Sequence, residues 1–231
     1  MRQDRKLDRR HFIAAAAGGA IPIGGAESKV NLSAEQQEEV HEVTPAEDLM
    51  FEHGIIERLL LIYDEAARRI DAGSQVPAKL IFDAASIVRS FAEDYHEKLE
   101  EQFVFPPLEK AAGYADLAKT LRAQHIAGQK ITSALLDMTK GGALAGPQQM
   151  AQAMRSFYRQ YLPHISRENS VAFRAFHGMM PHDEYVKLGE EFEEKEHSLF
   201  GEDGFDKTVD RVAAIESELG IYDLAQFTAK I

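Results

Sequence analysis

The sequence predicts an all-α protein built around an up-and-down four-helix bundle. Three observations predict it: steps of three and four between apolar residues in four long segments, no alternation typical of strands, and clusters of helix breakers between the segments. The breakers lie at residues 73–77, 106–113 and 141–147. We therefore expect the bundle over residues 46–178 and additional helices over residues 179–231.

Composition restricts the function classes. The chain of 231 residues is long enough for one folded domain with appendages. Its formal net charge of -12 disfavours binding to phosphate backbones and anionic lipids, so we expect no nucleic-acid partner. No apolar run is long enough to span a bilayer, so we expect no membrane contact in the mature form. The chain has no cysteine, so histidine, carboxylate or tyrosine side chains must bind any metal.

The first 26 residues are typical of a bacterial export signal. Basic residues precede a small and apolar run from Phe12 to Ala26. Residues 8–13, with Arg9 and Arg10, resemble a twin-arginine signal, which predicts a periplasmic or exported protein. The alternative is an apolar helix that packs on the body. A polar segment, residues 27–45, separates the signal from the bundle.

Each predicted helix carries one histidine within its apolar stripe. The first stripe runs from Leu49 to Ile70 and the second from Ala85 to Phe103. The third runs from Leu117 to Met138 and the fourth from Met150 to Ala175. Residues three and four apart share a helix face, so all four buried faces carry an imidazole. The histidines are His53, His96, His125 and His164.

Two glutamates extend this pattern, because Glu100 follows His96 by four residues and Glu168 follows His164 by four. A buried carboxylate is costly unless a positive charge neutralises it, and no lysine or arginine lies on the stripes near the histidines. A single histidine of this kind is more often a hydrogen-bonded core residue. Four in register, two of them with a glutamate, favour a bound metal.

An internal repeat fixes the arrangement. The segments 96–105 and 164–173 both read His, three residues, Glu, a polar residue and a final Phe, and a lone histidine lies upstream of each. Two such helix pairs about a pseudo-twofold axis supply two nitrogens for each of two metal ions, with two carboxylates between them. That is the ligand logic of carboxylate-bridged di-iron sites. Ligands of this type suit iron or manganese and leave zinc open.

The ordered series of His, His-x-x-x-Glu, His and His-x-x-x-Glu resembles the hemerythrin-like (HHE cation-binding) family. The resemblance covers residues 46–178 and includes the segment Glu100 to Pro106. It implies a non-haem centre of two iron ions in an up-and-down bundle. By position, His53 and His96 would bind one iron, His125 and His164 would bind the other, and Glu100 and Glu168 would bridge them.

One departure from the family pattern affects the expected activity. Oxygen-carrying members have a second histidine four residues after the third-helix histidine, where this chain has Gln129. The resemblance then implies that one iron has an open position or takes water, a tyrosine or another carboxylate. This argues against reversible oxygen carriage.

Other polar residues near the stripes have two interpretations. Glu97 and Glu101 could bind iron, but a solvated face is favoured, and Glu57 is expected to face solvent. Three tyrosines could donate a hydrogen bond to bound oxygen or supply a phenolate, but core packing with the hydroxyl reaching water is favoured. Surface positions account for the histidines outside the repeat. These tyrosines are Tyr63, Tyr95 and Tyr161, and these histidines are His41, His177, His182 and His197.

Three functions follow from this pattern. The first is a non-haem di-iron protein that binds or reduces dioxygen or peroxide, with no catalytic side chain assigned. The second is non-catalytic binding or sensing of dioxygen, nitric oxide or iron, and the third is a metal-free helical interaction module. No organic cofactor is expected, because nucleotide and nucleophile motifs are absent from the sequence. The helices expected over 185–200 and 209–219 either cap the bundle or pair with a second copy in a homo-oligomer.

Overall fold

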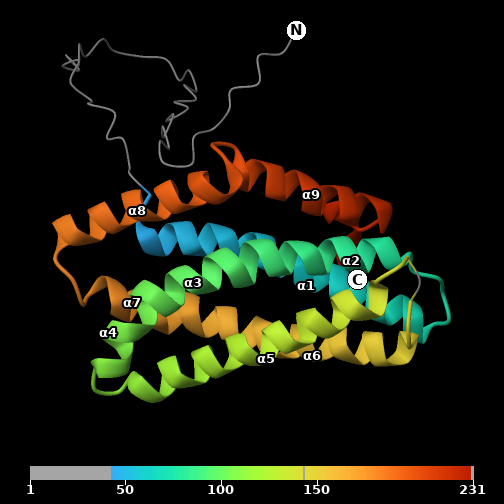
Figure 1. The fold of residues 1–231 in the computed structure, drawn as a ribbon, viewed down its shortest axis with the longest axis horizontal. Coiled ribbons are helices and arrows are strands. Elements are labelled where there is room, and N and C mark those ends of the chain that lie inside the picture. The colour runs from blue at the N-terminus through green and yellow to red at the C-terminus, as the bar shows by residue number, and fades with distance from the viewer. Residues whose placement is uncertain (1–42, 143, 230–231) are drawn as a thin grey trace, which may run out of the picture. The chain divides into compact units, whose positions relative to one another are not determined.

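The computed structural model describes residues 43–142 and 144–229, and helices are its regular secondary structure (Figure 1). The predicted export signal, residues 1–26, and the polar residues up to 42 lie outside this part of the chain. No helix in the described part is both long and apolar enough to cross a membrane.

Four helical rods form the bundle. Rods one and three are single helices, whereas rods two and four each contain π-helical stretches, labelled η. Helix α1 packs on α6, and α5 packs on both α2 and α6 (Figure 1). The predicted all-α four-helix bundle is confirmed. The rods are α1 (Pro45–Asp71); α2 (Ala78–Ile87), η1 (Val88–His96), α3 (Glu97–Leu99), η2 (Glu100–Val104) and α4 (Phe105–Lys110); α5 (Ala115–Thr139); and α6 (Pro147–Arg167), η3 (Glu168–Ala172) and α7 (Phe173–His177).

The turns between rods fall at the predicted breakers. Gly73 has a φ of 72° just after α1 ends, a conformation that favours glycine. Gly146 has a φ of 64° and precedes Pro147, the first residue of α6, where the missing N–H of proline removes no helical hydrogen bond. Glycine and proline therefore fix where these rods end and begin.

The C-terminal residues form α8 (His182–Phe200), α9 (Gly204–Glu218) and the short 3-10 helix η4 (Leu224–Phe227). Both α8 and α9 pack along α1 outside the four rods (Figure 1). Two hydrogen bonds of 2.9 and 2.6 Å join the Arg58 guanidinium on α1 to the Glu216 carboxylate on α9. The C-terminal helices therefore cover one side of the bundle. Pairing with a second copy stays a prediction.

The internal repeat extends to the backbone. Stretches η2 and η3 each contain five residues, and they begin at Glu100 and Glu168 respectively. A π-helical turn holds one more residue than an α-helical turn, so it changes the face on which the next residues lie, and such turns often occur at functional sites. Helix α6 runs through Pro163 to Arg167, and the change of helix type comes only at Glu168.

Candidate metal centre

The structure brings all six predicted ligands together in the core of the bundle. Each is at most 3% exposed. They come from all four rods: His53 from α1, His96 and Glu100 from η1 and η2, His125 from α5, and His164 and Glu168 from α6 and η3.

The four imidazoles form two pairs that meet through their Nε2 atoms. The Nε2 atoms of His53 and His96 lie 3.1 Å apart, and those of His125 and His164 lie 3.2 Å apart. Two imidazole nitrogens that bind one first-row metal ion at about 2.1 Å are about 3.0 to 3.4 Å from each other. Each pair therefore has the spacing of two ligands to one ion.

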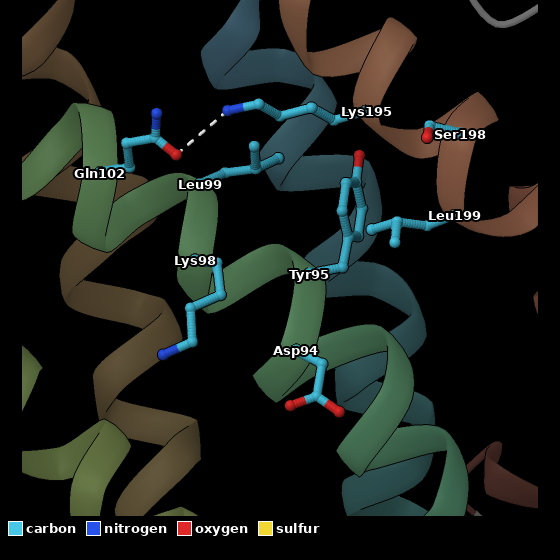
Figure 2. Close-up of a pocket in the computed structure, with 8 residues that line it drawn as sticks. All are labelled: Asp94, Tyr95, Lys98, Leu99, Gln102, Lys195, Ser198 and Leu199. Atoms are coloured by element: carbon cyan, nitrogen blue, oxygen red, sulfur yellow. Dashed lines mark hydrogen bonds between the residues drawn. The ribbon is translucent and has the colours of Figure 1, made fainter.

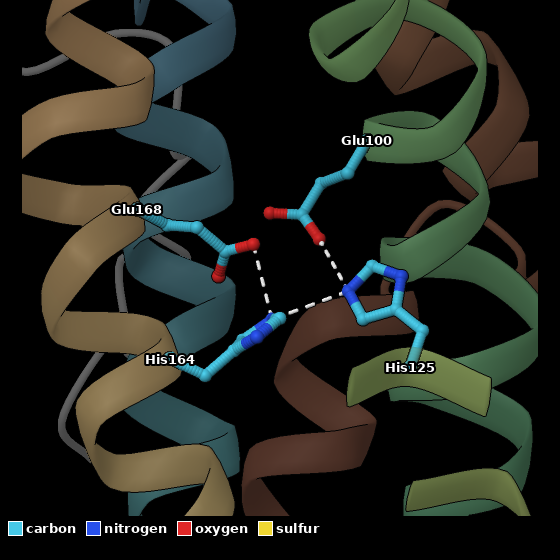
Figure 3. Close-up of side chains that lie close together, drawn as sticks. All are labelled: Glu100, His125, His164 and Glu168. Atoms are coloured by element: carbon cyan, nitrogen blue, oxygen red, sulfur yellow. Dashed lines mark hydrogen bonds and ion pairs between the residues drawn. The ribbon is translucent and has the colours of Figure 1, made fainter. Parts of the chain in front are cut away.

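The two carboxylates lie between the pairs. Oε1 of Glu100 is 3.5 Å from Nε2 of His96, and Oε2 of Glu100 is 3.3 Å from Nε2 of His125. Oε2 of Glu168 is 3.4 Å from Nε2 of His53, and Oε1 of Glu168 is 3.0 Å from Nε2 of His164. Figure 3 shows both carboxylates directed at the His125–His164 pair. Each glutamate thus presents one oxygen to each pair, as a bridging ligand does.

The Nδ1 atoms of the first pair point away from the site and form hydrogen bonds with other side chains. His96 Nδ1 lies 2.7 Å from Oε2 of Glu52, and His53 Nδ1 lies 2.7 Å from Oδ1 of Asn169. Both partners are oxygen acceptors, so each Nδ1–H donates to its partner. The Nε2 lone pairs are then directed into the site, which is the tautomer that binds metal.

The second pair has the same arrangement with longer contacts. His125 Nδ1 lies 3.2 Å from Oε1 of Glu101, and His164 Nδ1 lies 3.0 Å from Oε1 of Gln124. These acceptors fix the same tautomer, so all four Nε2 lone pairs converge.

The residues fit a pair of metal ions. Two pairs of nitrogen lone pairs face one another, and among the described residues no hydrogen bond reaches the four carboxylate oxygens of Glu100 and Glu168. Buried acceptors in this state are costly unless a cation satisfies them. Nitrogen and oxygen ligands without sulfur suit iron or manganese, and zinc also fits.

The charges of the site attract one another strongly. Burial acts to raise the pKa of Glu100, but His96 and His125 hold it well below its usual value. Burial acts to lower the pKa of His125, but Glu100 and Glu101 raise it to about 10. The carboxylates therefore favour positive charge in the site, which protons on the imidazoles carry in the metal-free chain and which a bound cation would supply in their place.

The two phenylalanines of the repeat cover the imidazoles. Phe173 stacks on His53 with ring centroids 5.4 Å apart and planes 13° apart. Phe105 lies against His125 with centroids 5.2 Å apart. Each phenylalanine thus covers a lone histidine, and its ring excludes water from that side of the site.

Gln129 does not occupy a ligand position. Its Nε2 donates to Oε2 of Glu97 at 2.9 Å, and the Tyr161 hydroxyl donates to Oε1 of the same carboxylate. Glu97 is only 1% exposed, so the solvated face favoured for it is wrong. Its Oε2 lies 3.9 Å from Nδ1 of His125, the ring nitrogen that points away from the site. In this arrangement neither Gln129 nor Glu97 replaces a fifth imidazole.

Gly128 makes room for Tyr161. A Cβ atom on Gly128 would lie 2.7 Å from Cε2 of Tyr161, closer than such contacts allow. The Tyr161 ring lies between those of Phe157 and His164, with centroids 4.2 and 5.2 Å away. The small residue on α5 therefore permits a tyrosine beside a candidate ligand.

Other expectations have mixed outcomes. Glu101 is partly exposed but accepts from His125, so a purely solvated face is wrong for it. Tyr63, Tyr95 and Tyr161 are at most 2% exposed, so their hydroxyls do not reach water as favoured. The exposed positions of Glu57 and three histidines are confirmed, and His41 lies outside the described residues. These histidines are His177, His182 and His197.

Sequence reasoning missed three outer partners of the imidazoles: Glu52, Gln124 and Asn169. The repeat contained a signal for them. Glu52 and Gln124 each come directly before a lone histidine, and Asn169 and Glu101 each come directly after one of the two candidate glutamates. All four have side-chain oxygens, as acceptors for Nδ1–H must have.

A surface pocket lies apart from these ligands, between the second rod and α8 (Figure 2). Lys195 on α8 donates to Oε1 of Gln102 at 3.1 Å across it. None of the six candidate ligands lines this pocket, so it is separate from the metal centre. Its lining residues are Asp94, Tyr95, Lys98, Leu99, Gln102, Lys195, Ser198 and Leu199.

Comparison with known families identifies the bundle. Residues 44–176 match the hemerythrin HHE cation binding domain. The chain belongs to this family. An uncharacterized protein of Mycobacterium tuberculosis strain H37Rv is 42% identical over 96% of this chain and 91% of its own length, and one from Mycobacterium bovis has the same identity and coverage. No solved structure matches the chain.

Proposed function

We propose that this hemerythrin-family chain is a non-haem di-iron protein that binds or reduces dioxygen or peroxide. One observation carries the proposal: four Nε2 atoms converge on two carboxylates that have no other hydrogen-bond partner in the described part of the chain. His53 and His96 would hold one iron, and His125 and His164 the other. Glu100 and Glu168 would bridge them.

Bound iron would supply the redox chemistry that this function needs. The protein's own residues hold the imidazoles and exclude water from two sides of the site. Phe105 and Phe173 cover two of the rings. Gln129 replaces the fifth imidazole of the family pattern, and its side chain donates to Glu97 instead. The missing ligand supports access of a small molecule to the second pair.

Loading the metal-free chain with ferrous iron without oxygen tests this function. We expect two iron ions per chain by elemental analysis, and steady consumption of peroxide when a reductant is present. The double variant His96→Ala/His164→Ala is the matched control, because it removes one imidazole from each pair and leaves the bridging carboxylates. An iron-loaded protein that is inert to both peroxide and dioxygen would contradict the proposal.

A second candidate is sensing of dioxygen, nitric oxide or iron without turnover. One contact favours it: carboxylate oxygens of Glu52, Asp48 and Glu196 lie within 4.8 Å of one another, and Glu52 also binds His96. Glu196 belongs to α8, so only Glu52 lies between this C-terminal helix and the candidate ligand His96. A reversible spectral change on adding and removing gas, without peroxide consumption, would favour this function.

The third candidate is a metal-free interaction module. Purified chain without metal, together with unchanged stability of His96→Ala, would select it.

We further propose export of the protein through the twin-arginine-like signal. Mass spectrometry of periplasmic material is expected to find a chain that begins after Ala26, and an intact chain in the cytoplasm would contradict export.

A further inference from the structure

The outer partners of the four imidazoles occupy equivalent positions in the two halves of the repeat. Glu52 and Gln124 each precede a lone histidine, and Asn169 and Glu101 each follow a bridging glutamate. Each imidazole pair thus has one carboxylate and one carboxamide partner. Their distances, burial and neighbouring charges nevertheless differ.

The carboxylate behind the first pair is deeply buried. Glu52 is 0% exposed, and its Oε2 lies 2.7 Å from Nδ1 of His96. Its Oε1 has no hydrogen-bond partner among the described residues. Among the described residues, the carboxyl groups of Asp48 and Glu196 lie within 4.8 Å of the Glu52 carboxyl group. In this low-dielectric position, the charge of Glu52 acts mainly on His96.

The carboxylate partner of the second pair makes a longer contact, is more exposed and is paired with a lysine. Glu101 lies 3.2 Å from Nδ1 of His125, and its side chain is 19% exposed. Its other oxygen pairs with Nζ of Lys98 at 2.7 Å. A neutralising lysine and contact with solvent both reduce the field that Glu101 exerts on the imidazole.

The carboxamide partners differ in the same direction. The His53 contact with Asn169 is 2.7 Å, and the His164 contact with Gln124 is 3.0 Å. Glu97 lies near His125, but Gln129 and Tyr161 already donate to both of its oxygens. Glu97 therefore acts on His125 only through its charge, at 3.9 Å from Nδ1, and makes no hydrogen bond to the ring.

Outer partners of this kind fix the ring and increase its basicity as a ligand, and losing one typically lowers metal affinity about 10- to 100-fold. We propose that the His53–His96 pair binds its metal ion first and tightly, and that the His125–His164 pair binds second and more weakly. Glu52 is the positioning residue responsible. The inference rests on the proposed metal centre. It makes the His125–His164 pair the one that exchanges its ion. This is the pair in whose half the chain has Gln129 where the family pattern has a fifth imidazole.

Titration of the metal-free full-length chain with Mn²⁺ tests this order, with calorimetry to resolve the steps and electron paramagnetic resonance to follow each ion. We expect two sequential steps that differ at least about tenfold in affinity. Glu52→Gln keeps an acceptor for His96 but removes the charge. It is expected to weaken the first step about 10-fold or more and to leave the second nearly unchanged.

Two matched variants of the second half complete the test. Glu101→Gln is expected to weaken only the second step, and by less than Glu52→Gln weakens the first. Gln124→Glu places a carboxylate at the position equivalent to Glu52, and it is expected to tighten the second step. Circular dichroism checks that each variant keeps its helices.

The outcomes separate this inference from the proposed function. Two equal steps in the unmodified chain, or a Glu52→Gln effect confined to the second step, would overturn the loading order while leaving a two-metal site. Absence of binding by both Mn²⁺ and Fe²⁺ would overturn the proposed function as well.

Discussion

The two halves of the repeat share their candidate ligands and differ in what surrounds them. Each half has a lone histidine, a His-x-x-x-Glu pair, a π-helical stretch that starts at the glutamate, and a phenylalanine that covers a lone histidine. The immediate neighbours are different. Glu52, Ile56 and Glu93 of the first half correspond to Gln124, Gly128 and Tyr161 of the second.

Two requirements therefore act separately on the chain. Metal chemistry restricts the inner residues to imidazoles and carboxylates, whereas packing and charge within each half restrict the outer residues. The first half has the buried aliphatic side chain of Ile56 at one of these outer positions. The second replaces that side chain with Gly128 and places the Tyr161 ring against it.

The largest expected effect comes from removing one histidine from either half. His96→Ala and His164→Ala should each lower the bound metal from about two ions per chain to one, since structural metal sites need most of their ligands. Elemental analysis after desalting measures this. The control is His177→Ala, because His177 is exposed. Unchanged metal content in both ligand variants would contradict the assignment.

A second pair of variants compares packing at equivalent positions. Ile56 is 1% exposed, and Ile56→Ala should cost about 2 to 5 kcal/mol of unfolding free energy by leaving a cavity. Gly128→Ala forces Tyr161 to move, which costs about 1 to 3 kcal/mol. The gain of about 1 kcal/mol in helix propensity partly offsets that cost. Denaturant unfolding of the metal-free chain gives both values, and a Gly128→Ala variant more stable than the unmodified chain would contradict the crowding.

A third comparison concerns Glu93 and its counterpart Tyr161. Burial raises the pKa of Glu93 to about 7, from a usual value of 4.5. The folded state thus binds the proton more tightly, so this contribution to stability is complete below about pH 4.5 and is lost as the pH rises through 7. Glu93→Gln should therefore match the unmodified chain at low pH.

Above pH 7 the Glu93→Gln variant should be more stable by on the order of 2 kcal/mol, since the ion pair of the Glu93 carboxylate with Arg89 reduces the full effect. Urea unfolding of both metal-free chains at a series of pH values measures the difference. A stability difference that does not change between pH 4.5 and 7 would contradict it.

The smallest expected effect concerns Gln129, whose counterpart Glu57 is exposed. Gln129→His supplies an imidazole to the second half only. If that ring reaches the open position, peroxide turnover should fall by up to about tenfold, or about 1.4 kcal/mol in the activation barrier. Initial rates of the iron-loaded variant measure this. Glu57→His is the control and should change nothing.

The sequence predicted the bundle and the six candidate ligands because both follow from local rules. Steps of three and four place His53, His96, His125 and His164 on buried faces, and the repeat aligns the two glutamates. The structure brings these side chains together, and their ligand role stays a proposal. The C-terminal helices were predicted too, although α8 begins at His182 and α9 at Gly204, before the expected starts.

What the sequence did not predict depends on contacts between distant segments. Glu97 is buried because Gln129 and Tyr161, from two other rods, satisfy both of its oxygens. Glu52 is buried beside Glu196 of α8, a helix outside the repeat. The change to π-helix at Glu100 and Glu168 has no periodic signature that could reveal it.

X-ray diffraction at the iron absorption edge from crystals of the iron-loaded chain tests the central claim most directly. We predict two anomalous peaks, one bonded to Nε2 of His53 and His96 and the other to Nε2 of His125 and His164, with Glu100 and Glu168 between them. Iron bound elsewhere, or no peak among these six side chains, would contradict the account.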